Sequence, residues 1–183
     1  MKTSVQKVLL AAGVCLCAAG PALAQSPSAD TAQPSAQQTM PAPSTADFVK
    51  TVAISDMFEV QSSKLALEKK AKPDAQFAKR MIHDHGQTTE QLKRLVDSGK
   101  VKAELPSGLD AEHQQMLDQL RGESGATFDK DYDQMQLKGH KEAVALFAAY
   151  ARSGDNAALK NWASKTLPHL QEHLAMAEKL SVR

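Results

Sequence analysis

The chain has 183 residues, of which 42% are hydrophobic and 23% charged, a composition typical of a soluble protein with room for one domain and its appendages. Its net charge of +1 and its 4% of aromatic residues argue against a nucleic-acid-binding protein, which needs a basic excess or a stacking platform. Nine glycines and eight prolines are too few for a strand-rich sandwich, so we expect a helical protein.

The N-terminus has the order of a secretory signal peptide. Lys2 and Lys7 give it a basic start, residues 8–19 are almost wholly apolar, and an A-x-A motif ends at Ala24. The apolar run is shorter than the roughly 20 residues that a spanning helix needs. We therefore expect residues 1–24 to be removed by cleavage after Ala24, which leaves a periplasmic mature chain with no transmembrane segment.

The mature chain is expected to combine a flexible tether with one folded domain. Residues 25–45 consist mainly of proline, alanine, serine, glutamine and threonine, with almost no large apolar residue. Such a segment cannot bury enough surface to offset the entropy of ordering, so we expect a disordered linker. Both cysteines, Cys15 and Cys17, fall in the leader, and the domain at residues 46–183 must therefore be stable without disulfides.

The domain contains four long segments and one short segment with helical periodicity. The long segments cover residues 46–70, 74–97, 126–152 and 155–180, and the short segment covers residues 110–120. Asp110 and Asp155 are typical N-cap residues, and Pro73 suits a helix start. A second apolar patch on the first segment, at Ile54 and Phe58, indicates that this helix is covered on two sides.

Short connections join the long segments into two antiparallel hairpins. The stretch between the hairpins is long enough to cross from one to the other, and it contains the short helix. The predicted fold class is therefore all-α, a ferritin-like four-helix bundle in which a long crossover joins the two hairpins.

One polar residue from each long helix falls within or beside the apolar stripe when residues are placed at intervals of about 100°. Glu59 lies inside the stripe of the first helix, and His85 lies inside that of the second. His140 lies at the edge of the third stripe and His173 at the edge of the fourth, with His169 one turn earlier and further out. His169 matches the others better in depth and His173 better in face, so periodicity leaves both as candidates.

Imidazoles with one carboxylate at the centre of a bundle suit zinc, copper or iron, so Glu59, His85, His140 and His173 form a candidate metal site. The alternative is that each side chain is a hydrogen-bonded core residue, for instance in a His–Glu ion pair without metal. No Glu-x-x-His step supports a dinuclear iron centre. No nucleophile motif or phosphate-binding loop supports an enzyme, and we identify no catalytic residue.

Several short motifs, in their order and spacing, resemble those of the DUF4142 family of exported bacterial proteins. The resemblance covers the whole folded part of the chain. The motifs are Phe48-Val49, Glu59-Val60, FAKRMIHDH at 77–85, Leu105-Pro106, FDKDY at 128–132, His140 followed by Leu146-Phe147, and WASKTLPHLQEHL at 162–174.

The resemblance implies a ferritin-like fold and favours His173 over His169 as the ligand from the last helix. It also implies that Asp84, Asp129 and Tyr132 support the ligands through hydrogen bonds. The family has no assigned activity, so the resemblance concerns fold and location rather than a reaction.

Two functions fit this sequence. The first is the binding of a transition metal in the bundle core by an exported protein that serves metal handling or protection from oxidative stress. The second is a non-enzymatic envelope-stress or structural module that holds no metal and acts through its surface. A homo-oligomer is compatible with this sequence, and no motif identifies a protein partner.

Overall fold

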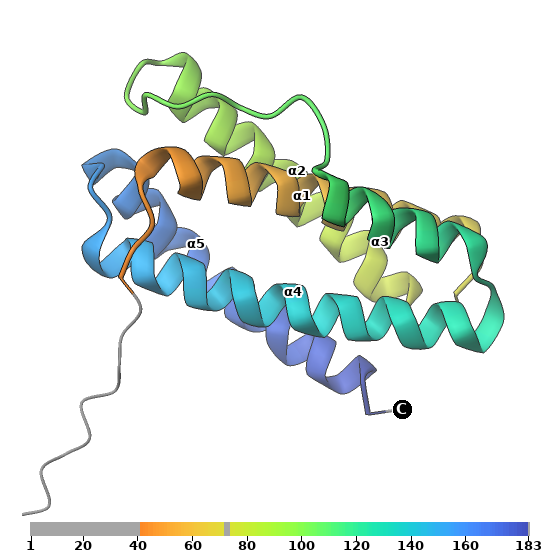
Figure 1. Cartoon of the computed structure of the whole chain (residues 1–183). Helices are drawn as coiled ribbons and strands as arrows, with labels where there is room; N and C mark the ends of the chain where they lie inside the picture. The colour runs from red at the N-terminus through yellow and green to blue at the C-terminus, as the bar shows by residue number, and fades with distance from the viewer. Residues whose placement is uncertain (1–40, 72–73, 183) are drawn as a thin grey trace, which may run out of the picture. The chain divides into compact units, whose positions relative to one another are not determined.

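The computed structural model describes residues 41–71 and 74–182, which contain five helices and no strand. The helices are α1 (Thr45–Glu68), α2 (Ala75–Asp97), α3 (Ala111–Gly122), α4 (Gly125–Ser153) and α5 (Ala157–Leu180) (Figure 1). The predicted all-α class is confirmed, and each helix begins and ends within two residues of its predicted bounds. The predicted leader, most of the predicted linker and Pro73 lie outside the described residues.

Side-chain caps fix the starts of α1, α3 and α5. Ser44 and Asp110 each accept a hydrogen bond from the backbone N–H three residues further on, which satisfies one of the free donors of the first turn. Asn156 does the same for α5, so the prediction that Asp155 is the cap is wrong by one residue. The Asp155 carboxylate instead accepts hydrogen bonds from the hydroxyls of Thr45, at 2.5 Å, and Tyr150, at 2.9 Å.

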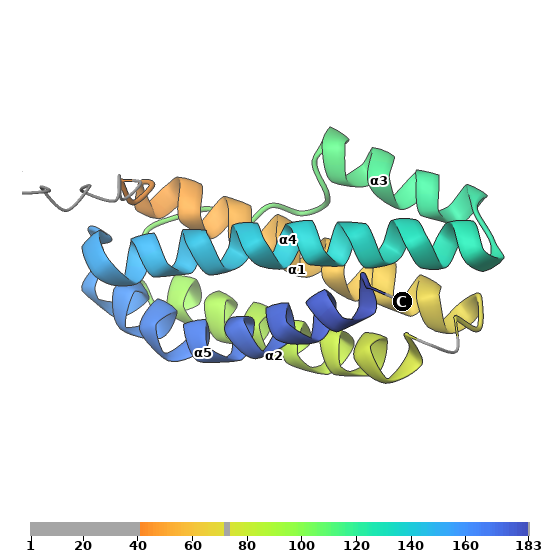
Figure 2. The same ribbon diagram turned by 90° about the horizontal axis from the view of Figure 1, so that it is seen from below.

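The four long helices lie side by side as two hairpins (Figures 1 and 2). Helix α1 packs against α2 and α4 packs against α5, while α1 also contacts α4 and α2 also contacts α5. Each long helix therefore has two long neighbours and turns one face towards a shared interior. No helix in the described part of the chain combines the length and apolar character needed to cross a membrane.

Helix α3 lies on the outside of α1 and α4 (Figure 2). Its buried Leu117 and Leu120 belong to the same apolar cluster as Phe58 of α1, and the His113 ring meets the Phe58 ring edge-on with centroids 5.5 Å apart. The second apolar patch of α1 is thus covered by α3, as the sequence predicts. Helix α3 therefore covers the outer side of α1 near its middle, where α1 also carries buried polar side chains.

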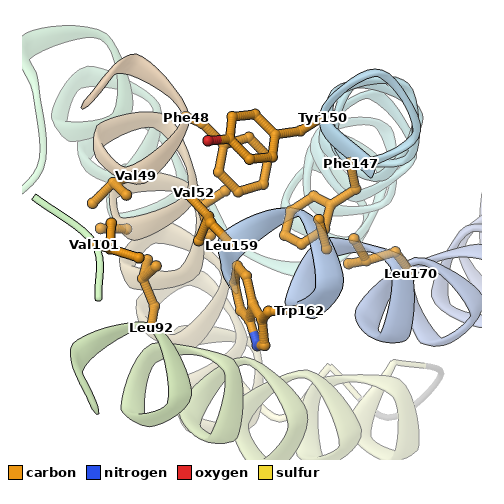
Figure 3. Packing of buried hydrophobic residues seen from close by; sticks show 12 residues of the cluster. Phe48, Val49, Val52, Leu92, Val101, Phe147, Tyr150, Leu159, Trp162 and Leu170 are labelled. Atoms are coloured by element: carbon orange, nitrogen blue, oxygen red, sulfur yellow. The ribbon is translucent and has the colours of Figure 1, made fainter. Parts of the chain in front are cut away.

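Two apolar clusters fill the interior, one towards each end of the long helices. The first cluster joins the start of α1, the end of α2, the end of α4 and α5 as far as Leu170 (Figure 3), and it includes Phe48, Val52, Leu92, Phe147, Tyr150 and Trp162. The second cluster joins the opposite ends, and it includes Phe58, Ala66, Phe77, Phe128, Tyr132 and Ala177. Burial of these side chains supplies the main driving force for folding.

Replacing Gly154 by alanine is expected to lower the free energy of unfolding by about 2–3 kcal/mol, as overpacking does in other proteins. Gly154 follows α4, and its N–H donates a 2.7 Å hydrogen bond to the carbonyl of Tyr150. A Cβ atom here would lie only 2.7 Å from that carbonyl oxygen, and it would also press on the Tyr150 ring. The backbone cannot yield without loss of the bond that ends the helix.

Urea-induced unfolding monitored by circular dichroism measures this loss. Gly86→Ala, within α2, is the matched control, because beyond its chain neighbours and the adjacent backbone of its own helix no described atom would lie within 4 Å of the added Cβ. We expect that control to be more stable than the parent protein by about 1 kcal/mol, since alanine favours helix over glycine. A Gly154→Ala protein as stable as the parent would contradict the prediction.

Candidate metal centre

A layer of buried polar side chains separates the two apolar clusters. All four long helices contribute to it near their middles, and a buried polar group costs free energy unless it finds a partner. Its members are Asp56, Glu59, Ser62, Ser63, His85, Gln136, His140, Thr166 and His173. So many polar groups at one level of an otherwise apolar interior indicate a site with a role beyond packing.

Three histidines from three helices meet in this layer. His85 of α2, His140 of α4 and His173 of α5 are 3%, 1% and 2% exposed. Their ring centroids lie 5.4–5.6 Å apart, and one metal-binding atom from each ring lies within 4.8 Å of the other two. The three rings are therefore close enough for one ion to contact all of them.

Asp56 of α1 holds the His85 ring in place. The side chain of Asp56 is buried, and its Oδ1 accepts a 2.7 Å hydrogen bond from His85 Nδ1. Thr88 and Thr89 donate to the other carboxylate oxygen at 2.7 and 3.3 Å. Burial acts to lower the pKa of His85, but the hydrogen bond and negative charge of Asp56 outweigh it and raise that pKa.

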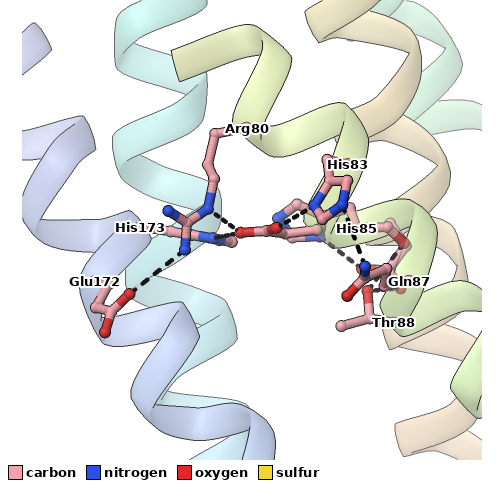
Figure 4. A network of polar contacts seen from close by, with 9 residues as sticks. Arg80, His83, His85, Gln87, Thr88, Glu172 and His173 are labelled. Carbon is pink, nitrogen blue, oxygen red and sulfur yellow. Dashed lines mark hydrogen bonds and ion pairs between the residues drawn. The ribbon is translucent and has the colours of Figure 1, made fainter. Parts of the chain in front are cut away.

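Asp84 of α2 holds the His173 ring. His173 Nε2 donates a 2.8 Å hydrogen bond to Asp84 Oδ2, and the same carboxylate accepts from Arg80 and, at 2.7 Å, from the ring of His83 (Figure 4). Burial acts to raise the pKa of Asp84, but the hydrogen bonds from these three side chains hold it well below its ordinary value. Asp84 is therefore a carboxylate. Burial lowers the pKa of His173 to about 4, which keeps its ring neutral at pH 7.

The backbone of α4 holds the His140 ring. His140 Nδ1 donates a 2.8 Å hydrogen bond to the carbonyl oxygen of Gln136, one turn earlier. Burial lowers the pKa of His140, so its ring too is neutral at pH 7. Each of the three histidines thus uses one ring nitrogen to donate to a fixed acceptor.

The second ring nitrogen of each histidine makes no hydrogen bond to the described residues. His85 Nε2, His140 Nε2 and His173 Nδ1 are buried and have no hydrogen-bond partner among residues 41–71 and 74–182. Because the first nitrogen of each ring carries the donated proton, the second presents a lone pair when the ring is neutral. Lone pairs on imidazoles whose other nitrogen donates to a carboxylate or carbonyl are characteristic of protein metal ligands.

Glu59 of α1 lies beside the three histidines. Its side chain is buried, and its Oε2 finds no hydrogen-bond partner within the part of the chain that the structure describes. A Cβ added to Gly139 would lie 3.3 Å from Glu59 Oε1, so α4 leaves room for the carboxylate by carrying a glycine there. Its charge acts to raise the pKa of both His85 and His140. Its oxygens are not among the atoms that lie within 4.8 Å of one another.

The remaining predicted site residues lie at different distances from the three histidines. Asp84 contacts one of them directly, whereas His169 is exposed on α5. Tyr132 is buried one layer away, with its hydroxyl 2.9 Å from Ser63 Oγ. Asp129 lines a separate hollow at the start of α4. The structure therefore brings together His85, His140 and His173 with Glu59 and Asp84 beside them, and it does not bring Asp129 or His169 to the same point.

Asp56 is the site residue that the sequence analysis missed. The carboxylate paired with His85 belongs to Asp56, whereas the sequence pointed to Glu59 as the acidic residue of the site. A signal was present, because Asp56 lies three residues before Glu59 and residues three apart share a helix face. Two acids on one face near the middle of α1 would have indicated that one of them could pair with a histidine while the other lies beside the ion.

Acid is expected to destabilise the metal-free protein through His173. The folded protein holds this pKa at about 4, below the ordinary histidine value of 6.5, so the unfolded chain binds the proton more readily. Stability is therefore fully present above pH 6.5 and falls as the pH drops towards 4, by about 3 kcal/mol in all. The raised pKa of His85 acts in the opposite direction, with stability lost as the pH rises through its folded value.

Urea unfolding at several pH values between about 7 and 4.5, with metal removed by chelator, checks this expectation. His173→Gln should show a flatter dependence on pH than the parent protein. His169→Gln, an exposed histidine on the same helix, is the matched control and should follow the parent curve. Identical profiles for the two variants would contradict the prediction.

Comparison with known proteins gives one match. The model of a protein family described as a domain of unknown function, DUF4142, matches residues 30–180, which is most of the chain, and the resemblance predicted from the sequence motifs is confirmed. No curated protein and no solved structure matches the chain. The comparisons therefore supply no activity, and any function has to be argued from the site.

Proposed function

We propose that this chain, which belongs to the DUF4142 family, binds one transition-metal ion between His85, His140 and His173. One observation carries the proposal. Each buried ring donates a hydrogen bond from one nitrogen to a fixed acceptor, its other nitrogen has no partner within the described chain, and the three rings offer ligand atoms within 4.8 Å of one another. Imidazole ligands suit zinc, copper or iron.

The proposed framework of the site is a ferritin-like four-helix bundle. Its support is the pairing of the long helices into two hairpins, the long connection between α2 and α4, and the presence of polar side chains from facing helices in the interior. A ligand on each of three helices ties both hairpins to one ion. Metal binding would then stabilise the folded protein as well as serve its function.

The proposed setting is the periplasm, to which the signal-like N-terminus would direct the mature chain. A metal site in an exported protein suits metal handling or protection from oxidative stress. The competing proposal is an envelope-stress or structural module without metal. In that case the Asp56–His85 and Asp84–His173 pairs serve only to satisfy buried polar groups, and their removal affects stability alone.

The metal content of the tag-free mature protein, purified from periplasm, tests the proposal. We expect about one ion per chain in the parent protein and none in a His85→Ala/His173→Ala double variant. The matched control is His113→Ala/His169→Ala, which removes two histidines that lie outside the three-histidine cluster and should keep the ion. Circular dichroism verifies that each variant is still helical.

Reconstitution with metal distinguishes a site that loses its ion during purification from a protein that has no metal site. The parent protein is stripped with chelator, incubated in turn with zinc, copper and iron salts, and freed of excess metal. A parent protein that holds no ion after this treatment would contradict the proposal and support the module without metal. Equal metal content in the two double variants would place the ion elsewhere, and it would contradict the assignment of these ligands.

A further inference from the structure

A cavity of about 470 Å³ opens beside the three histidines, between α1, α3 and α4. His85, Glu59 and Asp56 line it from the polar layer, and Met116 and His113 of α3 line it from the outside. Its volume lies within the range of pockets that hold small molecules. The proposed ion and this cavity therefore share His85 as a common boundary.

The chemistry of the walls selects against anions. Much of the lining is apolar, from side chains such as Val52, Phe58, Leu146 and Phe147. The ionisable lining residues are four acids against one lysine and two histidines, namely Asp56, Glu59, Glu112, Glu142, Lys138, His85 and His113. An excess of carboxylates disfavours a negatively charged ligand, and apolar walls favour one with an uncharged body.

Glu59 offers a carboxylate oxygen that accepts no hydrogen bond from the described residues. Its side chain is 3% exposed, and its Oε2 is buried with no partner in the described chain, although it faces a cavity with room for one. Buried carboxylate oxygens in native proteins normally accept hydrogen bonds, so an orphan of this kind indicates a missing donor. Gly139 keeps the opposite wall open at this point.

We propose that the cavity binds a small neutral ligand that coordinates the metal through a lone pair and donates an N–H or O–H hydrogen bond to Glu59. The proposal rests on the metal site proposed above. Three imidazole ligands leave a further coordination position, as in metal sites that bind exchangeable ligands. Glu59 thus stands beside the open position as an acceptor and does not fill it.

Cobalt(II) and imidazole are the probes for this proposal. Cobalt takes the place of the native ion and gives a visible absorption spectrum that responds to its ligands. Imidazole is neutral and compact, and it carries one lone-pair nitrogen and one N–H, which are the two features that the cavity selects. Addition of imidazole to the cobalt-loaded mature protein should change the spectrum in a saturable way, with the cobalt content unchanged after removal of the excess.

The variant Glu59→Gln provides the sharpest comparison, because it removes the charge and keeps the shape. We expect imidazole to bind about tenfold more weakly, since the acceptor of its hydrogen bond is then a neutral amide oxygen in place of a carboxylate. Azide, an anion, should bind more tightly to the same variant, because a nearby negative charge is gone. Opposite changes for the two probes are difficult to obtain from a general loss of structure.

A second variant tests the cavity itself. Ala143→Phe puts a ring into the cavity, whereas Ala175→Phe puts the same ring on the exposed face of α5. We expect the first to abolish the response to imidazole and the second to leave it unchanged, with about one cobalt per chain in both. A response that persists in Ala143→Phe would contradict the proposal.

The outcomes distinguish the two proposals. A parent protein that holds no cobalt, zinc, copper or iron would contradict both. A parent protein with one cobalt per chain and a spectrum that imidazole leaves unchanged would contradict only the ligand site. Loss of cobalt in Glu59→Gln would show that Glu59 is itself a ligand that fills the open position, and this too would overturn the ligand site alone.

Discussion

Replacing Asp56 by asparagine is expected to weaken metal binding by about 10- to 100-fold while the protein stays folded. The Asp56 carboxylate is 4% exposed and accepts a 2.7 Å hydrogen bond from His85 Nδ1. This bond fixes the orientation of the ring and increases the basicity of the nitrogen that faces the ion. Asparagine has nearly the same shape but no charge. The loss of metal affinity therefore measures how much the negative charge of Asp56 increases the basicity of that nitrogen.

Competition with a chromophoric chelator measures the zinc affinity of the variant. Asp97→Asn is the matched control, because Asp97 is an exposed acid of α2 that pairs with Lys93. The control should bind zinc as the parent protein does. An Asp56→Asn protein with the affinity of the parent would show that Asp56 does not support a metal ligand, and the Asp56–His85 pair would then be a purely structural contact.

Local sequence patterns account well for the helices and less well for their ends. Asp110 is predicted as a cap and is one, because its side chain reaches a backbone N–H only three residues away. Asp155 is predicted as a cap and is not. Its carboxylate is taken by the hydroxyls of Thr45 and Tyr150, and Asn156 caps the helix in its place. Thr45 is distant in sequence, so no local rule could have indicated this contact.

The same limit applies to the site. Periodicity places His85 and Glu59 on inward faces, because it needs only the residues of one helix. Periodicity does not indicate which inward side chains of two different helices contact each other. The contact between Asp56 and His85 was therefore not predicted. The position of Gly139 opposite Glu59 is equally invisible in the sequence, since it depends on how closely α1 and α4 approach.

His173, and not His169, is the histidine of α5 that lies in the three-histidine cluster. Depth along the helix favoured His169, whereas face and family resemblance favoured His173. The structure buries the His173 ring against Asp84 and leaves His169 exposed. Depth was the weaker guide because it assumes that all helices begin at one level, whereas α4 is longer than its neighbours.

Replacing Phe48 by alanine is expected to lower the free energy of unfolding of the metal-free protein by about 3–5 kcal/mol, the largest loss from any single change considered. Phe48 is fully buried at the start of α1 (Figure 3). Its ring stacks on Tyr150 with centroids 4.1 Å apart and meets Phe147 and Trp162 edge-on at 5.1 and 6.4 Å. Truncation removes these contacts and leaves a cavity among three rings that cannot all collapse into it.

Urea unfolding measures the loss, and Val182→Ala is the control, because Val182 is 83% exposed and its truncation should cost less than about 0.5 kcal/mol. Zinc at about 100 times its dissociation constant should then add about 2.7 kcal/mol to the parent and to Phe48→Ala alike. Equal increments are expected because Phe48 belongs to the apolar cluster at one end of the helices and the three histidines lie in the polar layer beyond it. A smaller increment in Phe48→Ala would contradict this independence, since it would mean that the aromatic cluster also holds the histidines in position for the ion.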